Sequence, residues 1–105
     1  MDKTSFTITK HSEAPDIQFE AAGYIVYETA GQLEKALTDS FLDNPESITV
    51  DMEKVALFTS VGIRVILKVC RNATEKGIVF LIVNPSDTVR NVMKLSNLTD
   101  LLVKK

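Results

Sequence analysis

The stretch from residue 57 to residue 67 reads LFTSVGIRVIL, an apolar run interrupted by two hydroxyl residues and a glycine. A short strand at 48–52 and a brief loop precede it, and its spacing predicts a helix over 60–76. The first four N–H groups of a helix lack intrahelical partners, and a Ser or Thr side chain can accept from one of them. Thr59 or Ser60 is therefore expected to be the N-cap, worth about 1 kcal/mol.

A glycine, Gly62, lies inside the first turn of this predicted helix. It costs about 1 kcal/mol relative to alanine, which indicates that another backbone or a partner's surface approaches closely there. A phosphate on Ser60 would meet exposed N–H groups and add a charge of about −1.5 to −2. Two interpretations stay open at this point: a plain helix cap, and a modifiable switch that changes what docks on this surface.

Two strands are predicted upstream, where apolar residues alternate with polar ones. The first runs through Phe6 and Ile8 and the second through Ile17 and Phe19, with a turn at 12–16 that contains a proline. This pattern predicts an antiparallel hairpin.

Three helices and one further strand are predicted after Gly23 interrupts the second strand. The helices are expected at 29–41, starting at Thr29, and at 60–76 and 86–95. Gly77 is expected as the left-handed cap of the second helix. Six consecutive apolar residues at 78–83, IVFLIV, predict a central strand buried on both faces.

The resulting order is β-β-α-β-α-β-α with short connections. It predicts a single α/β domain over residues 1–105, with a mixed sheet packed with helices. The initial hairpin is expected to be antiparallel and the later strands parallel.

The composition narrows the functional class. The chain is 45% hydrophobic and 25% charged, as is ordinary for a soluble domain. Its net charge of −2 argues against nucleic acid as the main partner, because no basic patch could neutralise many phosphates. The sequence shows neither an apolar run long enough to cross a membrane nor a signal peptide, so a cytoplasmic location without membrane attachment is expected.

Residues for catalysis or metal binding are scarce. One histidine, His11, and one cysteine, Cys70, cannot form a zinc site of His and Cys ligands. An exposed histidine at a strand end and a small buried cysteine explain both more simply than a catalytic role. The glycines match neither a dinucleotide-binding nor a P-loop spacing. The expectation is a protein that is not an enzyme and needs no metal or cofactor.

Residues 51–102 carry a characteristic succession of features. They are Phe58-Thr59-Ser60-Val61-Gly62-Ile63, Lys76-Gly77, Ile78 to Val83, Asn84-Pro85-Ser86, Val89-Arg90 and Leu95-Ser96-Asn97-Leu98. The succession resembles the STAS domain, the fold of the bacterial anti-sigma factor antagonists. In that family a strand leads to an Asp-Ser-Ser/Thr-Gly-Leu motif that opens a helix. A Lys/Arg-Gly pair, an apolar strand, a proline-containing turn and a Val-Arg helix follow.

The resemblance implies that Ser60 is a phosphoacceptor. In the family, the unphosphorylated antagonist binds an anti-sigma factor that is also a serine kinase, which frees the sigma factor, and phosphorylation ends the binding. The implied partners are such a kinase, which carries the ATP, and a phosphatase. The implied contact residues are Thr59, Ser60, Val61, Gly62 and Arg64.

Three positions depart from the family pattern. Thr59 stands where the family usually has an aspartate, Val26 stands where it often has another, and Asn97 replaces a glycine. The two lost carboxylates remove negative charge around Ser60. They favour an alternative, a non-switching STAS scaffold or accessory subunit that binds its partner permanently.

A basic stripe is expected on the second helix. Arg64, Lys68 and Arg71 recur at helical spacing. The stripe is interpreted as a solvated face, and the alternative is that it contacts an acidic groove on a partner.

Overall fold

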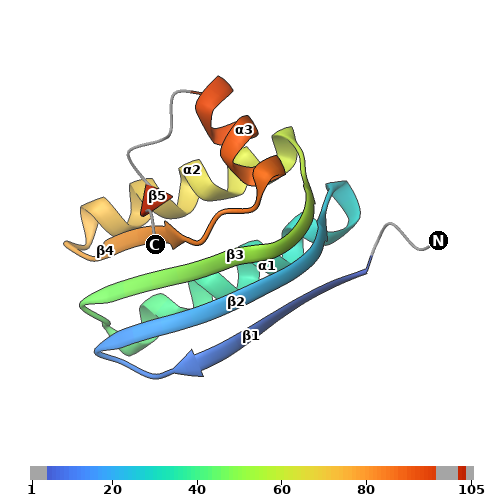
Figure 1. The fold of residues 1–105 in the computed structure, drawn as a ribbon. Helices are drawn as coiled ribbons and strands as arrows, with labels where there is room; N and C mark the ends of the chain where they lie inside the picture. The colour runs from blue at the N-terminus through green and yellow to red at the C-terminus, as the bar shows by residue number, and fades with distance from the viewer. Residues whose placement is uncertain (1–4, 97–101, 104–105) are drawn as a thin grey trace.

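The computed structural model describes residues 5–96 and 102–103 (Figure 1). The elements are β1 (Phe6–Ser12), β2 (Asp16–Ile25), α1 (Tyr27–Asp39), a 3₁₀ turn η1 (Ser40–Asp43), β3 (Ser47–Phe58), α2 (Ser60–Glu75), β4 (Val79–Val83), α3 (Asp87–Leu95) and β5 (Leu102–Val103). Within these residues the strands form one sheet in the order β1-β2-β3-β4-β5. β1 pairs antiparallel with β2, and all later pairs are parallel, which confirms the predicted mixed sheet.

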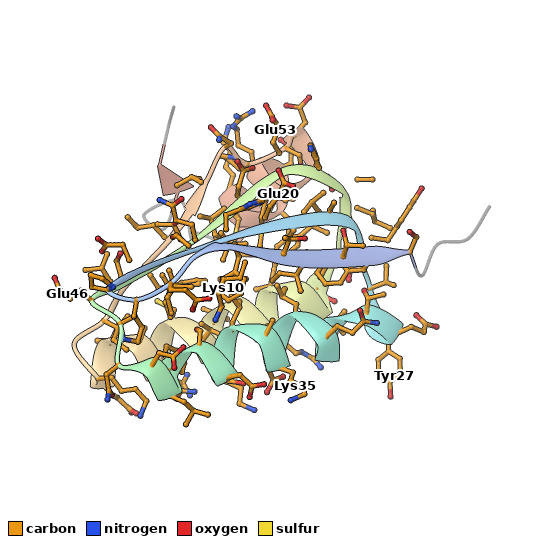
Figure 2. All side chains as sticks on the ribbon, turned by 90° about the horizontal axis from the view of Figure 1, so that it is seen from below. Lys10, Glu20, Tyr27, Lys35, Glu46 and Glu53 are labelled. Atoms are coloured by element: carbon orange, nitrogen blue, oxygen red, sulfur yellow. The ribbon has the colours of Figure 1, made fainter. Side chains whose placement is uncertain are left out.

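One face of the sheet carries the hydrophobic core. The parallel registers align Ile17 with Ile48 and Ile48 with Phe80, so one buried row crosses three strands. α1 and α2 cover this face (Figure 2). The residues between the buried ones point to the opposite face, because successive side chains of a strand alternate. α3 contacts β3 and α2.

The length of β3 and the place of β4 differ from the prediction. β3 continues well past residue 52 to Phe58, because its second half pairs with residues 22–25 of β2 beyond an irregularity in the register. β3 is therefore the central strand, and the prediction that 78–83 is central was wrong. The prediction that this strand is buried on both faces was also wrong, since Val79 is 54% exposed and only Phe80 and Ile82 are buried within β4.

The first helix begins earlier than predicted. α1 starts at Tyr27, and Thr29 is already in its first turn. The Thr29 hydroxyl donates to the Tyr24 carbonyl at 2.6 Å, and its oxygen accepts from the Val26 N–H at 3.0 Å. Thr29 therefore binds the chain that leads into the helix, as a capping residue in the third position does.

The other two helices begin and end close to the predicted residues. Gly77 follows α2 with a φ of +71°, and the N–H of Ile78 donates to the Ala73 carbonyl at 2.8 Å, which confirms the left-handed cap. Ser86 is the N-cap of α3, and its hydroxyl oxygen accepts from the Val89 N–H. Asn97, one of the three departures from the family pattern, lies outside the described residues.

Candidate protein-binding site at the start of helix α2

The start of α2 is fixed to the end of β2. Ile25 and Phe58 are register partners at the carboxyl ends of β2 and β3. The next residue, Thr59, donates twice to the Ile25 carbonyl: its backbone N–H lies at 3.2 Å and its hydroxyl oxygen at 3.0 Å. The first turn of α2 therefore lies beside the junction between β2 and α1.

Thr59 is the N-cap residue of α2, but its side chain makes no capping hydrogen bond. The hydroxyl is used for the bond to Ile25 instead. The helix is opened by backbone bonds alone, from Gly62 N to Thr59 O at 2.9 Å and from Ile63 N to Thr59 O at 3.2 Å. The expectation of a side-chain cap worth about 1 kcal/mol was therefore wrong, because a strand carbonyl competes for the hydroxyl.

Gly62 is buried in the first turn of α2. A Cβ atom at this position would lie 2.7 Å from Phe58 Cε1 and 2.8 Å from Ile25 Cγ2. The predicted close approach is confirmed, but the approaching groups belong to the protein itself. Gly62 therefore shapes the site from within and is not one of its exposed contact residues.

The remaining implied contact residues reach the surface. Ser60 and Arg64 are exposed, whereas Thr59 and Val61 are half-buried. Ser60 and Arg64 are one helical turn apart, so they share a face. Because the Thr59 hydroxyl is engaged and Val61 has none, Ser60 supplies the available hydroxyl at this helix start.

Two exposed apolar residues near the helix start were not singled out from the sequence. Tyr27, the first residue of α1, is 82% exposed, and Leu57 of β3 is 36% exposed. Tyr27 lies two residues after Ile25, whose carbonyl accepts the hydrogen bond from the Thr59 hydroxyl. Tyr27 lies three residues before Ala30, so helical spacing alone gave no signal of its exposure. Exposed tyrosines are frequent energetic centres of protein interfaces.

The positions where the family has carboxylates hold neutral residues here, Val26 and Thr59. Val26, at the first of those positions, is half-buried and is the N-cap residue of α1. The first turn of α2 contains no acidic residue. In the basic stripe, Lys68 Nζ lies 2.7 Å from Glu34 Oε2, whereas Arg64 and Arg71 form no ion pair within residues 5–96.

The structure also places the other side chains considered from the sequence, His11 and Cys70. No group of three or more His, Cys, Asp or Glu side chains in the part of the chain that the structure describes could hold a metal ion. His11 is exposed, and Cys70 is a half-buried free thiol. No helix among the described residues is long and apolar enough to cross a membrane.

Replacing the two helical glycines by alanine should have opposite effects. We expect Gly62→Ala to lower the free energy of unfolding by about 1–3 kcal/mol, because the added methyl group must displace Phe58 or Ile25. Gly31 of α1 is exposed, with nothing within 4 Å of an added Cβ, so Gly31→Ala should raise it by about 0.5–1 kcal/mol. Urea unfolding followed by circular dichroism measures both, and equal effects would contradict this account of Gly62.

The two hydroxyl residues should also differ. Thr59→Val keeps the shape but loses the bond to the Ile25 carbonyl, so we expect a loss of about 0.5–1.5 kcal/mol in unfolding free energy. Ser60→Ala should change it by less than about 0.5 kcal/mol, because Ser60 is not the cap. The same urea titrations test this, and a larger loss for Ser60→Ala than for Thr59→Val would contradict the assignment.

Comparisons with known proteins agree with this architecture. Among solved structures, the chain is similar to an anti-sigma factor antagonist from Mycobacterium paratuberculosis, with a TM-score of 0.85, 20% identity, and coverage of 98% of this chain and 87% of that one. It is also similar to the anti-sigma factor antagonist SpoIIAA in its unphosphorylated form, with a TM-score of 0.80, 20% identity, and coverage of 96% and 88%. For phosphorylated SpoIIAA from Bacillus the TM-score is 0.75 at 17% identity, with coverage of 96% and 91%.

Among curated proteins, none matches the chain significantly in sequence. The family model of the STAS domain matches residues 6–105, which include every element described above. The chain therefore belongs to the STAS domain family.

Proposed function

We propose that this protein is an anti-sigma factor antagonist that binds an anti-sigma factor with serine kinase activity and is released when Ser60 is phosphorylated. It would thereby regulate transcription indirectly, in the cytoplasm and without enzymatic activity of its own. The observation that carries the proposal is the exposed Ser60 at the first position of α2, in a STAS fold. The similarity to SpoIIAA, which is known in phosphorylated and unphosphorylated forms, supports it.

The proposed contact surface combines both strand-to-helix junctions. We define the α2-start surface as Tyr27, Leu57, Thr59, Ser60, Val61 and Arg64. It offers apolar area from a tyrosine and a leucine, and one arginine that makes no ion pair within the described residues. A partner whose surface is apolar with an acidic rim fits this combination.

Phosphorylation would act on this surface through desolvation. In the free protein, the phosphate would be stabilised by the first N–H groups of α2 and by the helix dipole. In the complex it would lose water without an assured cationic partner, at a cost of several kcal/mol per buried ion. About 4 kcal/mol weakens binding roughly a thousandfold, which is enough for release. The kinase would supply the ATP, and a phosphatase would restore the binding form.

A second candidate function is a constitutive STAS scaffold. Matched at Gly62-Ile63, the family motif Asp-Ser-Ser/Thr-Gly-Leu places Ser60 and Val61 at its two hydroxyl positions. The second hydroxyl is therefore missing, and Thr59 replaces the aspartate. In this function the same surface would bind a partner permanently, and Ser60 would stay unmodified.

The two functions are separated by variants of Ser60. We expect Ser60→Ala to bind the cognate kinase as tightly as the unmodified protein, because it adds no charge. Ser60→Asp should bind at least about tenfold more weakly, since a buried carboxylate also loses its hydration. Binding is measured by biolayer interferometry, and phosphate on Ser60 is detected by mass spectrometry after incubation with kinase and ATP.

Thr74→Asp is the matched control, because Thr74 is exposed at the opposite end of the same helix. It should bind normally. Equal binding by Ser60→Ala and Ser60→Asp, with no phosphate on Ser60, would reject the switch and leave the constitutive scaffold.

A further inference from the structure

The face of the sheet opposite α1 and α2 contains a pocket of about 300 Å³. Its polar lining consists of His11, Gln18, Glu20, Thr49, Asp51 and Asn84. None of these residues belongs to the α2-start surface. The pocket is at the lower end of the size range for small-molecule sites, about 300–1,000 Å³.

The strand register explains why these side chains converge. Gln18 is paired with Thr49, and Glu20 with Asp51, across the parallel strands β2 and β3. Because side chains alternate along a strand, all four project from one face, while Phe19 and Val50 between them enter the core. Figure 2 shows Glu20 pointing away from α1 and α2, on the side opposite to Lys10.

Glu20 and Asp51 are neighbouring carboxylates on this face. Neighbouring strands of a sheet lie about 4.8 Å apart, so two carboxylates at paired positions repel each other at close range. Within the described residues, Asp51 accepts hydrogen bonds from two neutral donors, the Glu53 N–H at 2.9 Å and the Asn84 amide at 3.0 Å. Among the described residues, Asp51 therefore has no cationic partner, whereas Glu20 has an ion pair with Lys54.

Two side chains approach Glu20 without forming a hydrogen bond to it. Lys54 Nζ is 3.6 Å from Glu20 Oε2, and His11 Nε2 is 3.8 Å from Glu20 Oε1, both beyond hydrogen-bond length. The Lys54 side chain is 63% exposed and does not line the pocket. Glu20 thus retains oxygen lone pairs that can accept hydrogen bonds from a ligand.

The other residues that line the pocket add uncharged polar groups and apolar side chains. In the part of the chain that the structure describes, the side chains of Gln18 and Thr49 make no hydrogen bond. Asn84, held at a φ of +48°, binds Asp51 through its amide nitrogen, which leaves its side-chain oxygen as an acceptor. Phe19 and Val83 contribute the apolar part of the lining.

We propose that this pocket binds a small primary ammonium group on a short aliphatic body. An ammonium nitrogen has three N–H donors, which suit the carboxylates of Glu20 and Asp51 and the hydroxyl of Thr49. The aliphatic body would lie along Val83. An anion would be repelled by the two carboxylates, and a neutral polyol would not relieve their mutual repulsion.

The ammonium group can come from a free amine or from a lysine side chain of a partner. Titrations of the ¹⁵N-labelled protein, followed by amide chemical shifts, separate the two sources. Putrescine represents the free amine, and Nα-acetyl-lysine amide represents the side chain. We expect saturable shifts at residues 18–20 and 49–51 with putrescine, which should bind more tightly. Tighter binding of the lysine compound would overturn the free-amine assignment, and no saturable shift with either compound would overturn the site.

Two further probes test the chemistry. Tetramethylammonium carries the charge but no N–H donor, and inorganic phosphate is an anion. Neither should shift the amides of residues 18–20 and 49–51. Equal shifts from tetramethylammonium would overturn the proposal, because they would indicate general attraction to an acidic face.

The matched variants are Glu20→Gln and Glu53→Gln. Glu53 projects from the same face and its backbone binds Asp51, but its side chain does not line the pocket (Figure 2). We expect Glu20→Gln to weaken putrescine binding about tenfold, because it removes a charge-assisted hydrogen bond, and Glu53→Gln to change it less than about twofold. Equal weakening by both variants would overturn the pocket as a specific site, and the amide spectrum of each variant verifies its fold.

Discussion

The packing of Gly62 against Phe58 and Ile25 is the contact on which the α2-start surface depends. It joins the last residues of β2 and β3 to the first turn of α2, and even a methyl group at position 62 would lie within 3 Å of both neighbours. The double hydrogen bond from Thr59 to the Ile25 carbonyl acts on the same junction. Together these contacts fix the direction in which α2 leaves the sheet, so Ser60 and Arg64 are exposed while Gly62 is buried.

The order of the strands explains why α1 and α2 leave one face of the sheet uncovered. β2, β3 and β4 are parallel and follow one another in order across the sheet. Right-handed crossovers in one direction place α1 and α2 on the same face. The opposite face must then be polar wherever no helix covers it, and Gln18, Glu20, Thr49 and Asp51 occupy it. The contact surface at the helix start and the pocket on the open face are therefore two consequences of one connectivity.

Sequence patterns within a single element predicted helices and strands correctly. The alternation through Ile17 and Phe19, the glycine after residue 76 and the Asn-Pro-Ser turn each identified an element that the structure contains. The errors arose where distant pairing decides. β3 extends to Phe58 because β2 continues beyond Gly23 and offers it a partner, and no pattern within residues 53–58 shows this. The burial of residues 78–83 was overestimated because apolar composition does not reveal that one face of β4 is less covered than the other: Val79, Leu81 and Val83 alternate with the buried Phe80 and Ile82.

The sequence by itself determined the fold class, the family and the position of Ser60 at a helix start, because periodicity, caps and motif spacing are local properties of the chain. Only the tertiary structure decided what each residue of that helix start does. The Thr59 hydroxyl binds a carbonyl 34 residues away in sequence instead of capping the helix. Gly62 makes room for two side chains of the protein itself, and the start of α2 is bound to Ile25 although a whole helix and strand separate them in sequence. The pairing of Glu20 with Asp51 was equally hidden, because the register between two strands is set by packing of their buried faces and not by the polar residues that the register brings together.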